Sequence, residues 1–268
     1  NPKLDVVDIS EVSKTAKKEK IPFIVDNTVA TPYLIKPIEH GADIVIHSTT
    51  KYITGNGTSI GGIIIDAGKF DWSSGKFSEF TEPSPGYHGL IYHEALGPAA
   101  FIAKARIEGL RDLGSAPSPF NCFQTIQGLE TLSVRIKKHS ENALKVAEWL
   151  ESQEAIAWVN YPGLKSSKYH ELSKKYLKNG QSGIVTFGLK KGFEGGKKLT
   201  DSTKIFSLLA NFGDSKSLII HPASTTHQQL SEKEQEKTGV TADLIRLSIG
   251  LEDPVDLIND LSESMKRV

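Results

Sequence analysis

The residues best suited to chemistry lie in "HSTTKYITGNGTSIGG", which runs from His47 to Gly62. A lysine, Lys51, comes directly after the hydroxyl residues Ser48, Thr49 and Thr50, and a run of glycines follows it. A lysine amine can form a Schiff base with a carbonyl compound, and hydroxyl and free backbone N–H groups can bind a phosphate. A lysine in such a loop is more often simply exposed to solvent, so other residues must support a chemical role.

Two apolar runs place an acid near this lysine. "IPFIVDN" (residues 21–27) ends with Asp26, and "ADIVIHS" (residues 42–48) ends just before Lys51. Both runs are short and β-branched, which is typical of parallel strands covered on both faces. Ligands bind outside the carboxyl ends of such strands, so the polar groups there are expected to share one edge of the sheet. These groups are Asp26, Ser48, Thr50 and Lys51.

Pyridoxal phosphate (PLP) is a cofactor that requires this set of groups. Its aldehyde forms a Schiff base with a lysine, and a carboxylate keeps its ring nitrogen protonated, so that the ring accepts electrons. Its phosphate requires hydroxyl and N–H donors. Lys51, Asp26 and the pair Ser48 and Thr50 match these roles.

Other sites fit the same stretch less well. A dinucleotide-binding fingerprint needs a third glycine where Ile60 stands, after Gly55 and Gly57. A P-loop carries its lysine after the glycines, whereas Lys51 precedes them. A third hypothesis, an enzyme whose lysine forms a Schiff base without PLP, remains possible. It would give the acid and the phosphate donors no role.

A second charged side chain lies within an apolar run. In "LIRLSIG" (residues 244–250), Arg246 shares one face of the expected strand with Leu244 and Ser248. An arginine stays charged, so within a strand it needs an anionic partner. A structural salt bridge or a solvent-facing edge strand would explain Arg246 equally well.

The remaining reactive side chains do not predict a metal site. His88 and His93 lie outside a His-Glu-x-x-His pattern. His221 and His227 could line an active site, but two histidines do not make a metal centre. The single cysteine, Cys122, is expected to be a core thiol rather than a nucleophile, because no basic surroundings are evident.

The composition is that of an ordinary globular protein. Of the 268 residues, 38% are hydrophobic, and the 32 basic side chains balance 32 acidic ones. This balance gives no field that would attract nucleic acid or an anionic membrane. One cysteine excludes an intrachain disulfide framework, and no transmembrane span or signal peptide is evident. We therefore expect a cytoplasmic protein without nucleic-acid or membrane partners.

Alternating strand and helix patterns predict an α/β protein in two parts. A third apolar run, "GGIIID" (residues 61–66), is expected to join the parallel sheet, and further strands are expected at 183–189, 217–221 and 244–250. Helices are expected over residues 6–20 (starting near Ser10) and 32–41, from Leu132 onward, and at the C-terminus, where Asp253 caps and Pro254 opens the helix. A boundary near Gly128 divides the chain into 1–129 and 130–268.

Beyond these patterns, the chain resembles the Cys/Met-metabolism family of PLP-dependent enzymes. The resemblance is carried by "VDNTVATPYLIKPIEHGADIVIHSTTKYITGNG", "GLETLSVRIKKHSENALKVAEWL" and "HPASTTHQQLSEKEQEKTGVTADLIRLSIGLED", and it covers essentially the whole chain. It implies an aspartate-aminotransferase-like fold (fold type I), with 1–129 as the C-terminal part of the PLP-binding large domain and 130–268 as a smaller C-terminal α/β domain. The long insert over residues 70–114 is most similar to the O-acetylhomoserine sulfhydrylase branch.

The resemblance also implies a role for each matching residue. Lys51 would hold the cofactor and move protons, and Asp26 would pair with the pyridine nitrogen. Ser48 and Thr50 would bind the phosphate. Arg246, helped by Ser217, would bind the substrate carboxylate. Asn1 would lie beside the cofactor.

The reaction implied is a γ-replacement that converts O-acetyl-L-homoserine and sulfide to L-homocysteine and acetate. Two alternatives remain. The same scaffold could catalyse cystathionine γ-synthesis or the γ-elimination of methionine or cystathionine, or the chain could be an inactive or assembly fragment. In the family a segment before Asn1 supplies a ring-stacking tyrosine and part of the neighbouring subunit's site. We therefore expect this chain to be N-terminally incomplete, to require that segment, and to form a homotetramer built from dimers.

Overall fold

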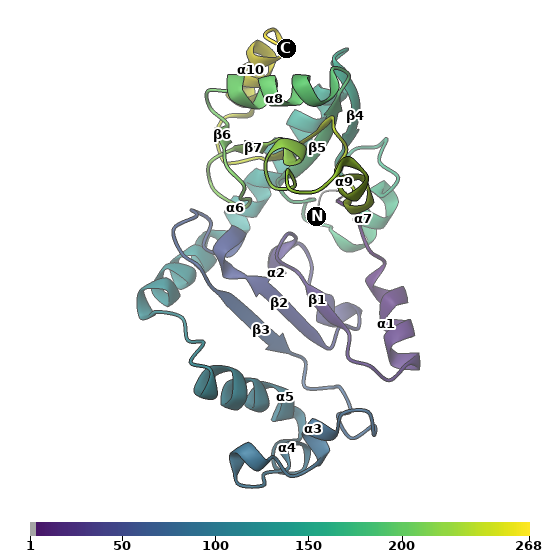
Figure 1. Ribbon diagram of the computed structural model, residues 1–268, viewed down its shortest axis with the longest axis vertical. Coiled ribbons are helices and arrows are strands. Elements are labelled where there is room, and N and C mark those ends of the chain that lie inside the picture. The colour runs from purple at the N-terminus through teal and green to yellow at the C-terminus, as the bar shows by residue number, and fades with distance from the viewer. Residues whose placement is uncertain (1–3) are drawn as a thin grey trace.

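The computed structural model describes residues 4–268 and contains two β-sheets linked by one long helix (Figure 1). The strands are β1 (Ile24–Asp26), β2 (Ile44–Ser48), β3 (Gly62–Asp66), β4 (Ile156–Asn160), β5 (Ile184–Leu189), β6 (Ser207–Leu208), β7 (Leu218–Ile220) and β8 (Leu244–Ser248). The helices are α1 (Ile9–Lys18), α2 (Thr31–Leu34), α3 (Ser78–Thr81), α4 (Tyr92–Leu96), α5 (Ala100–Lys104), α6 (Pro119–Glu151), α7 (His170–Tyr176), α8 (Gly192–Ser202), α9 (Glu232–Thr238) and α10 (Pro254–Met265). This mixture confirms the α/β prediction.

The first sheet, with the order β1-β2-β3, carries the predicted cofactor residues. β1 pairs in parallel with β2, as predicted, so that Asp26 lies opposite Ile46. β3 pairs antiparallel with β2, and Gly62 lies opposite Ser48. The prediction of a parallel, doubly covered strand was wrong for β3, because the short connection from β2 reverses the chain direction. Its isoleucines Ile63, Ile64 and Ile65 are 37–49% exposed.

The second sheet has the order β4-β5-β8-β7-β6 and is mostly antiparallel. The predicted strands at 183–189, 217–221 and 244–250 correspond to β5, β7 and β8. The sequence analysis missed β4 and β6, because one is interrupted by a register shift and the other has only two residues. β8 lies at the centre of this sheet, between β5 and β7, so Arg246 is not on an edge strand.

Helix α6 begins earlier than the sequence pattern indicated. The pattern predicted a helix from Leu132 onward, but the helix starts at Pro119. Ser118 accepts a hydrogen bond from the Asn121 N–H at 3.1 Å and caps the helix. Pro119 takes the first helical position, where a missing N–H costs nothing. The proline therefore starts the helix and does not break it.

The two other predicted helix starts differ in outcome. Helix α1 begins at Ile9, and Asp8 caps it by accepting a hydrogen bond from the Glu11 N–H at 3.2 Å. The predicted start near Ser10 was therefore one residue too late. Helix α10 begins as predicted, with Asp253 accepting from the Val255 N–H at 2.8 Å. None of the described helices is both long and apolar enough to cross a membrane.

The segment between β3 and α6 forms a helical cluster of its own at the lower end of the molecule (Figure 1). Helices α3, α4 and α5 pack around Trp72, which is 4% exposed and stacks against Phe80 and Phe101. This aromatic cluster also includes Ile44 of β2, so it rests on the first sheet. The insert noted in the sequence is therefore an ordered part of the fold.

The predicted division at 129/130 falls inside α6. This helix contacts the turn after β2 at its first half and β4, β5 and α10 further along. The two parts thus share a structural element, and their separation into a large and a small domain stays a prediction.

Helix α6 lies close to the turn after β2 at Gly128. A Cβ atom added there would lie 2.2 Å from the carbonyl oxygen of Ile53. We expect Gly128→Ala to lower the free energy of unfolding by about 1–3 kcal/mol, because main chain must move to admit the methyl group. Gly109→Ala is the control, since nothing lies within 4 Å of its added Cβ, and alanine there should be neutral or stabilise by up to about 1 kcal/mol. Denaturant unfolding of both variants measures the difference, and equal stability would contradict the close contact.

Candidate active site

Lys51 lies in a tight turn directly after β2. The turn Thr49–Ile53 has π-type hydrogen bonding, and Lys51 departs from helical geometry with φ −91° and ψ −130°. The Lys51 carbonyl accepts a hydrogen bond from the Gly55 N–H at 2.8 Å, and the Thr49 carbonyl accepts from the Thr54 N–H at 3.0 Å. Such single π turns often occur at functional sites.

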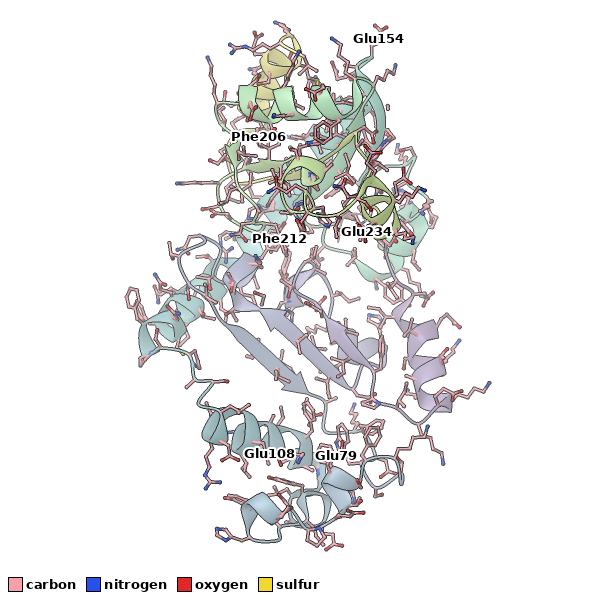
Figure 2. All side chains as sticks on the ribbon, in the orientation of Figure 1. Glu79, Glu108, Glu154, Phe206, Phe212 and Glu234 are labelled. Carbon is pink, nitrogen blue, oxygen red and sulfur yellow. The ribbon has the colours of Figure 1, made fainter. Side chains whose placement is uncertain are left out.

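The amine of Lys51 faces the second sheet. Its Nζ donates to Asn211 Oδ1 at 2.5 Å and lies 4.9 Å from the ring centre of Phe212. Phe212 lies where the two sheets meet (Figure 2). Burial, and then the positive charge of Arg246, lower the pKa of Lys51 below its usual value. Sequence reasoning missed Asn211 and Phe212, because they lie 160 residues beyond Lys51 in a loop without a recognisable pattern.

Asp26 is held in place by a residue that the sequence analysis also missed. Its Oδ1 accepts hydrogen bonds from the N–H and the hydroxyl of Thr28, at 3.0 and 2.6 Å. The same Thr28 hydroxyl oxygen accepts from the Ser48 N–H at 2.8 Å. Thr28 thereby joins the ends of β1 and β2 and brings Asp26 and Ser48 to one edge, as predicted. The spacing Asp-x-Thr is the local signal that could have identified it.

A histidine lies behind this edge. His47 is 4% exposed, and no described residue bonds to its Nδ1. Burial lowers the pKa of His47, while the negative charge of Asp26 acts in the opposite direction. Burial therefore favours the uncharged ring at neutral pH.

The two predicted phosphate ligands have different surroundings. No described residue hydrogen-bonds the hydroxyl of Ser48, which is half-buried. The hydroxyl of Thr50 accepts from the Gly61 N–H at 3.1 Å and donates to the Gly61 carbonyl at 3.3 Å. Ser48 is therefore free to donate to a ligand, whereas Thr50 would have to exchange its weak bond to Gly61.

Arg246 lies beside the lysine from the opposite sheet. Its Nη2 donates to the Asn211 main-chain carbonyl at 3.2 Å, so Asn211 contacts both cations. No carboxylate of residues 4–268 pairs with Arg246. Burial lowers its pKa, but a guanidinium remains charged. Neither the salt bridge nor the edge strand predicted as an alternative is present among the described residues, so Arg246 is available to bind an anionic ligand.

Ser217 has a different environment from Arg246. It is fully buried; its hydroxyl donates to Glu252 Oε2 at 2.8 Å and accepts from the Gly250 N–H at 2.8 Å. The Ser217 hydroxyl thus has partners within the fold, and Asn211 is the residue that hydrogen-bonds Arg246. The help of Ser217 in binding the substrate carboxylate stays a prediction. Asn1, the other predicted cofactor neighbour, lies outside the described residues.

The other singled-out residues lie apart from this site. His221 is fully buried, and its ring bonds to Ser224 and to the Ala242 carbonyl at 2.8 Å each, which makes it a core residue. Cys122 is exposed on the first turn of α6, so the prediction of a core thiol was wrong. Within residues 4–268 no cluster of side chains could hold a metal ion, and none was predicted.

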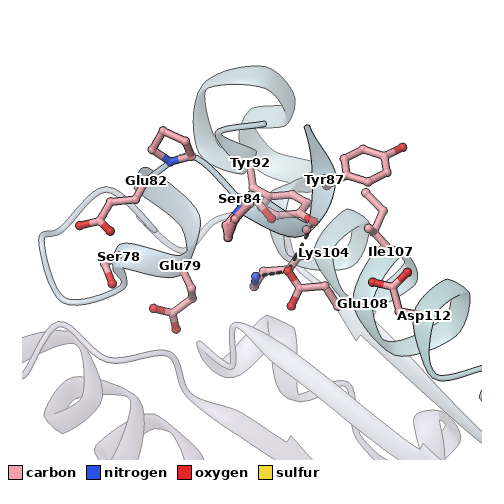
Figure 3. A pocket seen from close by; sticks show the side chains of 13 residues that line it. Ser78, Glu79, Glu82, Ser84, Tyr87, Tyr92, Lys104, Ile107, Glu108 and Asp112 are labelled. Carbon is pink, nitrogen blue, oxygen red and sulfur yellow. Dashed lines mark hydrogen bonds and ion pairs between the residues drawn. The ribbon is translucent and has the colours of Figure 1, made fainter. Parts of the chain in front are cut away.

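A separate pocket of about 380 Å³ lies within the helical cluster (Figure 3). Its lining comes from residues 78–112 and includes Tyr87, Tyr92 and the ion pair of Lys104 with Glu108. None of the predicted site residues lines it.

Comparison with known proteins agrees with this geometry. The sequence profile described as "Cys/Met metabolism PLP-dependent enzyme" matches residues 1–266. The chain belongs to this family. The predicted family, cofactor and fold type I architecture are therefore confirmed.

Individual relatives share much of the sequence. The chain is 55% identical to a Leptospira meyeri protein named O-acetyl-L-homoserine sulfhydrylase and 47% identical to a Schizosaccharomyces pombe protein named homocysteine synthase. It covers 63% of the length of each, while 100% and 99% of this chain are aligned. The chain thus spans less than two thirds of these relatives.

A solved structure supports the fold. A Campylobacter jejuni protein named as an O-acetylhomoserine (thiol)-lyase superimposes with a TM-score of 0.94 at 48% identity, over 99% of this chain and 64% of that protein. That structure contains a lysine modified as N'-pyridoxyl-lysine-5'-monophosphate.

The residues of this chain fit PLP. A partly desolvated amine, a carboxylate with one oxygen unbonded, and a free hydroxyl lie at adjoining strand ends. These are the donors and acceptors that the aldehyde, the ring nitrogen and the phosphate of the cofactor require.

We predict that Thr28→Val loosens this edge of the sheet. The variant leaves the partly buried Ser48 N–H without an acceptor and Asp26 without its hydroxyl donor, so the free energy of unfolding should fall by about 1–3 kcal/mol. Thr28→Ser, which keeps the hydroxyl, is the control and should lose less than half as much. Chemical denaturation without added cofactor measures the stability of both variants. Equal losses of stability would show that the hydrogen bonds of the Thr28 hydroxyl do not stabilise the fold.

Proposed function

We propose that the full-length protein converts O-acetyl-L-homoserine and sulfide to L-homocysteine and acetate. The observation that carries this proposal is that Asn211 binds both the Lys51 amine and the Arg246 guanidinium, and that Arg246 has no carboxylate partner among residues 4–268. Lys51 follows β2, which pairs with β1, the strand that ends in Asp26. The names of the relatives at 44–55% identity support this reaction over others in the family. The long helical insert adds support through its similarity to the sulfhydrylase branch.

Lys51 would move protons during the reaction. Bound PLP supplies an electron sink for the charge that forms when a proton leaves the substrate Cα. Because burial and Arg246 lower the pKa of Lys51, a larger share of the amine is neutral near pH 7 than for a surface lysine, and only the neutral amine can accept a proton. Asn211 Oδ1 would orient the amine between transfers.

Arg246 would fix the substrate carboxylate. A planar guanidinium can hold a carboxylate through two parallel hydrogen bonds, which determines the direction of the Cα–H bond. The Asn211 carbonyl already anchors Nη2 of Arg246, so the side chain is oriented before a substrate binds. Asp26 would pair with the ring nitrogen, and Ser48 and Thr50 would bind the phosphate.

The assembly is proposed on similar grounds. Several apolar side chains of the first half of α6 are exposed: Phe120 at 65%, Phe123 at 56% and Ile126 at 57%. Such surface favours burial against another chain. We propose a homotetramer built from dimers, in the cytoplasm, and a segment outside this chain that completes each site.

The proposal predicts where the cofactor attaches. When the full-length protein is incubated with PLP and reduced with borohydride, peptide mass mapping should locate the adduct on Lys51. In Lys51→Ala the adduct should be absent and the formation of homocysteine from O-acetyl-L-homoserine and sulfide should fall by about 10²–10⁴ or more. Assays with cysteine, or with no added thiol, distinguish cystathionine γ-synthesis and γ-elimination. An unlabelled Lys51, or unimpaired sulfhydrylation in the variant, would end the proposal.

A second prediction concerns Arg246. Arg246→Lys keeps the charge but cannot hold a carboxylate through two parallel bonds, so KM for O-acetyl-L-homoserine should rise by roughly 10-fold or more. PLP attachment to Lys51 should stay intact, as measured by borohydride mapping. Arg106→Lys, on the exposed surface, is the control. A KM equal to that of the control would remove Arg246 from substrate binding.

A further inference from the structure

The turn that carries Lys51 is held by a cation that has no acidic partner. Arg135 of α6 donates from Nη1 to the Tyr52 carbonyl at 2.7 Å and from Nη2 to the Ile53 carbonyl at 3.0 Å. Nη2 also donates to the Gly128 carbonyl at 2.7 Å. Nε donates to the Thr131 hydroxyl at 3.1 Å. No carboxylate of residues 4–268 forms an ion pair with Arg135.

Burying a charged guanidinium without an acidic partner costs free energy, so other contacts of Arg135 must compensate for it. Half-burial lowers the pKa of Arg135 from its usual value, yet a guanidinium keeps its charge. Its planar donors fit carbonyl groups that point in different directions, which a single ammonium cannot match. The two carbonyls of the turn belong to the residues immediately after Lys51.

Two glycines and a tyrosine hold the same turn from other sides. A Cβ atom on Gly128 would lie 2.2 Å from the Ile53 carbonyl oxygen, and one on Gly213 would lie 2.6 Å from the Tyr52 nitrogen. The Tyr52 hydroxyl accepts from the Gly183 N–H at 3.1 Å, which ties the turn to the second sheet. The position of Tyr52 is thus set at both its main chain and its side chain.

We propose that Arg135 is a positioning residue for Lys51: by binding the carbonyls of Tyr52 and Ile53 it sets the direction in which the Lys51 side chain leaves the turn. Because Lys51 has non-helical backbone angles, regular helical hydrogen bonding does not fix this direction. The contact of Nζ with Asn211 depends on it. The importance of this positioning for catalysis rests on the proposed function. The effect of Arg135 on the geometry of Lys51 does not.

The test uses the full-length protein freed of PLP, because bound cofactor would occupy the Lys51 amine. Each lysine is measured by reductive methylation with formaldehyde and cyanoborohydride over a pH series, followed by peptide mass spectrometry. In Arg135→Met, Lys51 should lose its contacts and its burial. Its methylation midpoint should therefore rise by about half a pH unit or more, roughly a threefold change in the neutral fraction. Lys137→Met, exposed on the same helix, is the control and should leave Lys51 unchanged. Both variants retain Arg246, whose charge acts on Lys51, and also Asp26, His139 and Asp214.

An unchanged Lys51 profile in a folded Arg135→Met protein would overturn the proposal. If this variant does not fold by circular dichroism, Arg135→Lys decides the question. It keeps the charge but binds fewer carbonyls, so the Lys51 midpoint should shift by less than is expected for Arg135→Met but by more than in the control. No shift overturns the proposal. Failure of PLP to label wild-type Lys51 would reject the proposed function, while the methylation profile would still test Arg135.

Discussion

Buried side chains of α6 bind main-chain carbonyl groups of the two segments that carry Lys51 and Arg246, and the site depends on these hydrogen bonds. Arg135 binds the carbonyls that follow Lys51. Four residues further along, burial lowers the pKa of His139 to about 4, so the ring is neutral and its Nδ1 donates to the Ile249 carbonyl at 2.7 Å. Asn142 donates to the Gly250 and Glu252 carbonyls at 3.1 and 2.8 Å. Residues at this spacing share one helix face, so one helix fixes both segments.

The apolar packing of α6 strengthens the same coupling. Leu132 and Ile136 belong to a cluster with Tyr52 and Phe212, beside the lysine. Two turns further, Ala143 begins a stretch that packs in the core of the second sheet. Because the helix contributes to both clusters, a shift of one sheet against the other would disturb packing in each. The predicted division at 129/130 runs through the first of these clusters, which has members on both sides of it.

The electrostatics of the site follow from the same arrangement. Lys51, Arg246 and Arg135 gather positive charge without a paired carboxylate among the described residues. Main-chain carbonyls and the Asn211 amide compensate part of this charge. The rest favours anionic ligands, and the phosphate and carboxylate groups of the proposed cofactor and substrate meet that requirement. A chain with balanced overall charge can thus still attract anions at one place.

The sequence alone determined the features that depend on neighbours along the chain. Apolar runs ending in Asp26 and in Ser48 predicted strands with their polar groups at one edge, and Asp253 with Pro254 predicted the start of α10, because strand burial and helix capping are local. Only the tertiary structure decided the direction of β3, the role of Pro119 as a helix start, and the neighbours of the Lys51 amine. Those outcomes depend on contacts between residues far apart in sequence, such as Lys51 with Asn211 and Arg135 with Tyr52. No local pattern encodes them, since the free energy of such a contact is gained only when the whole chain folds.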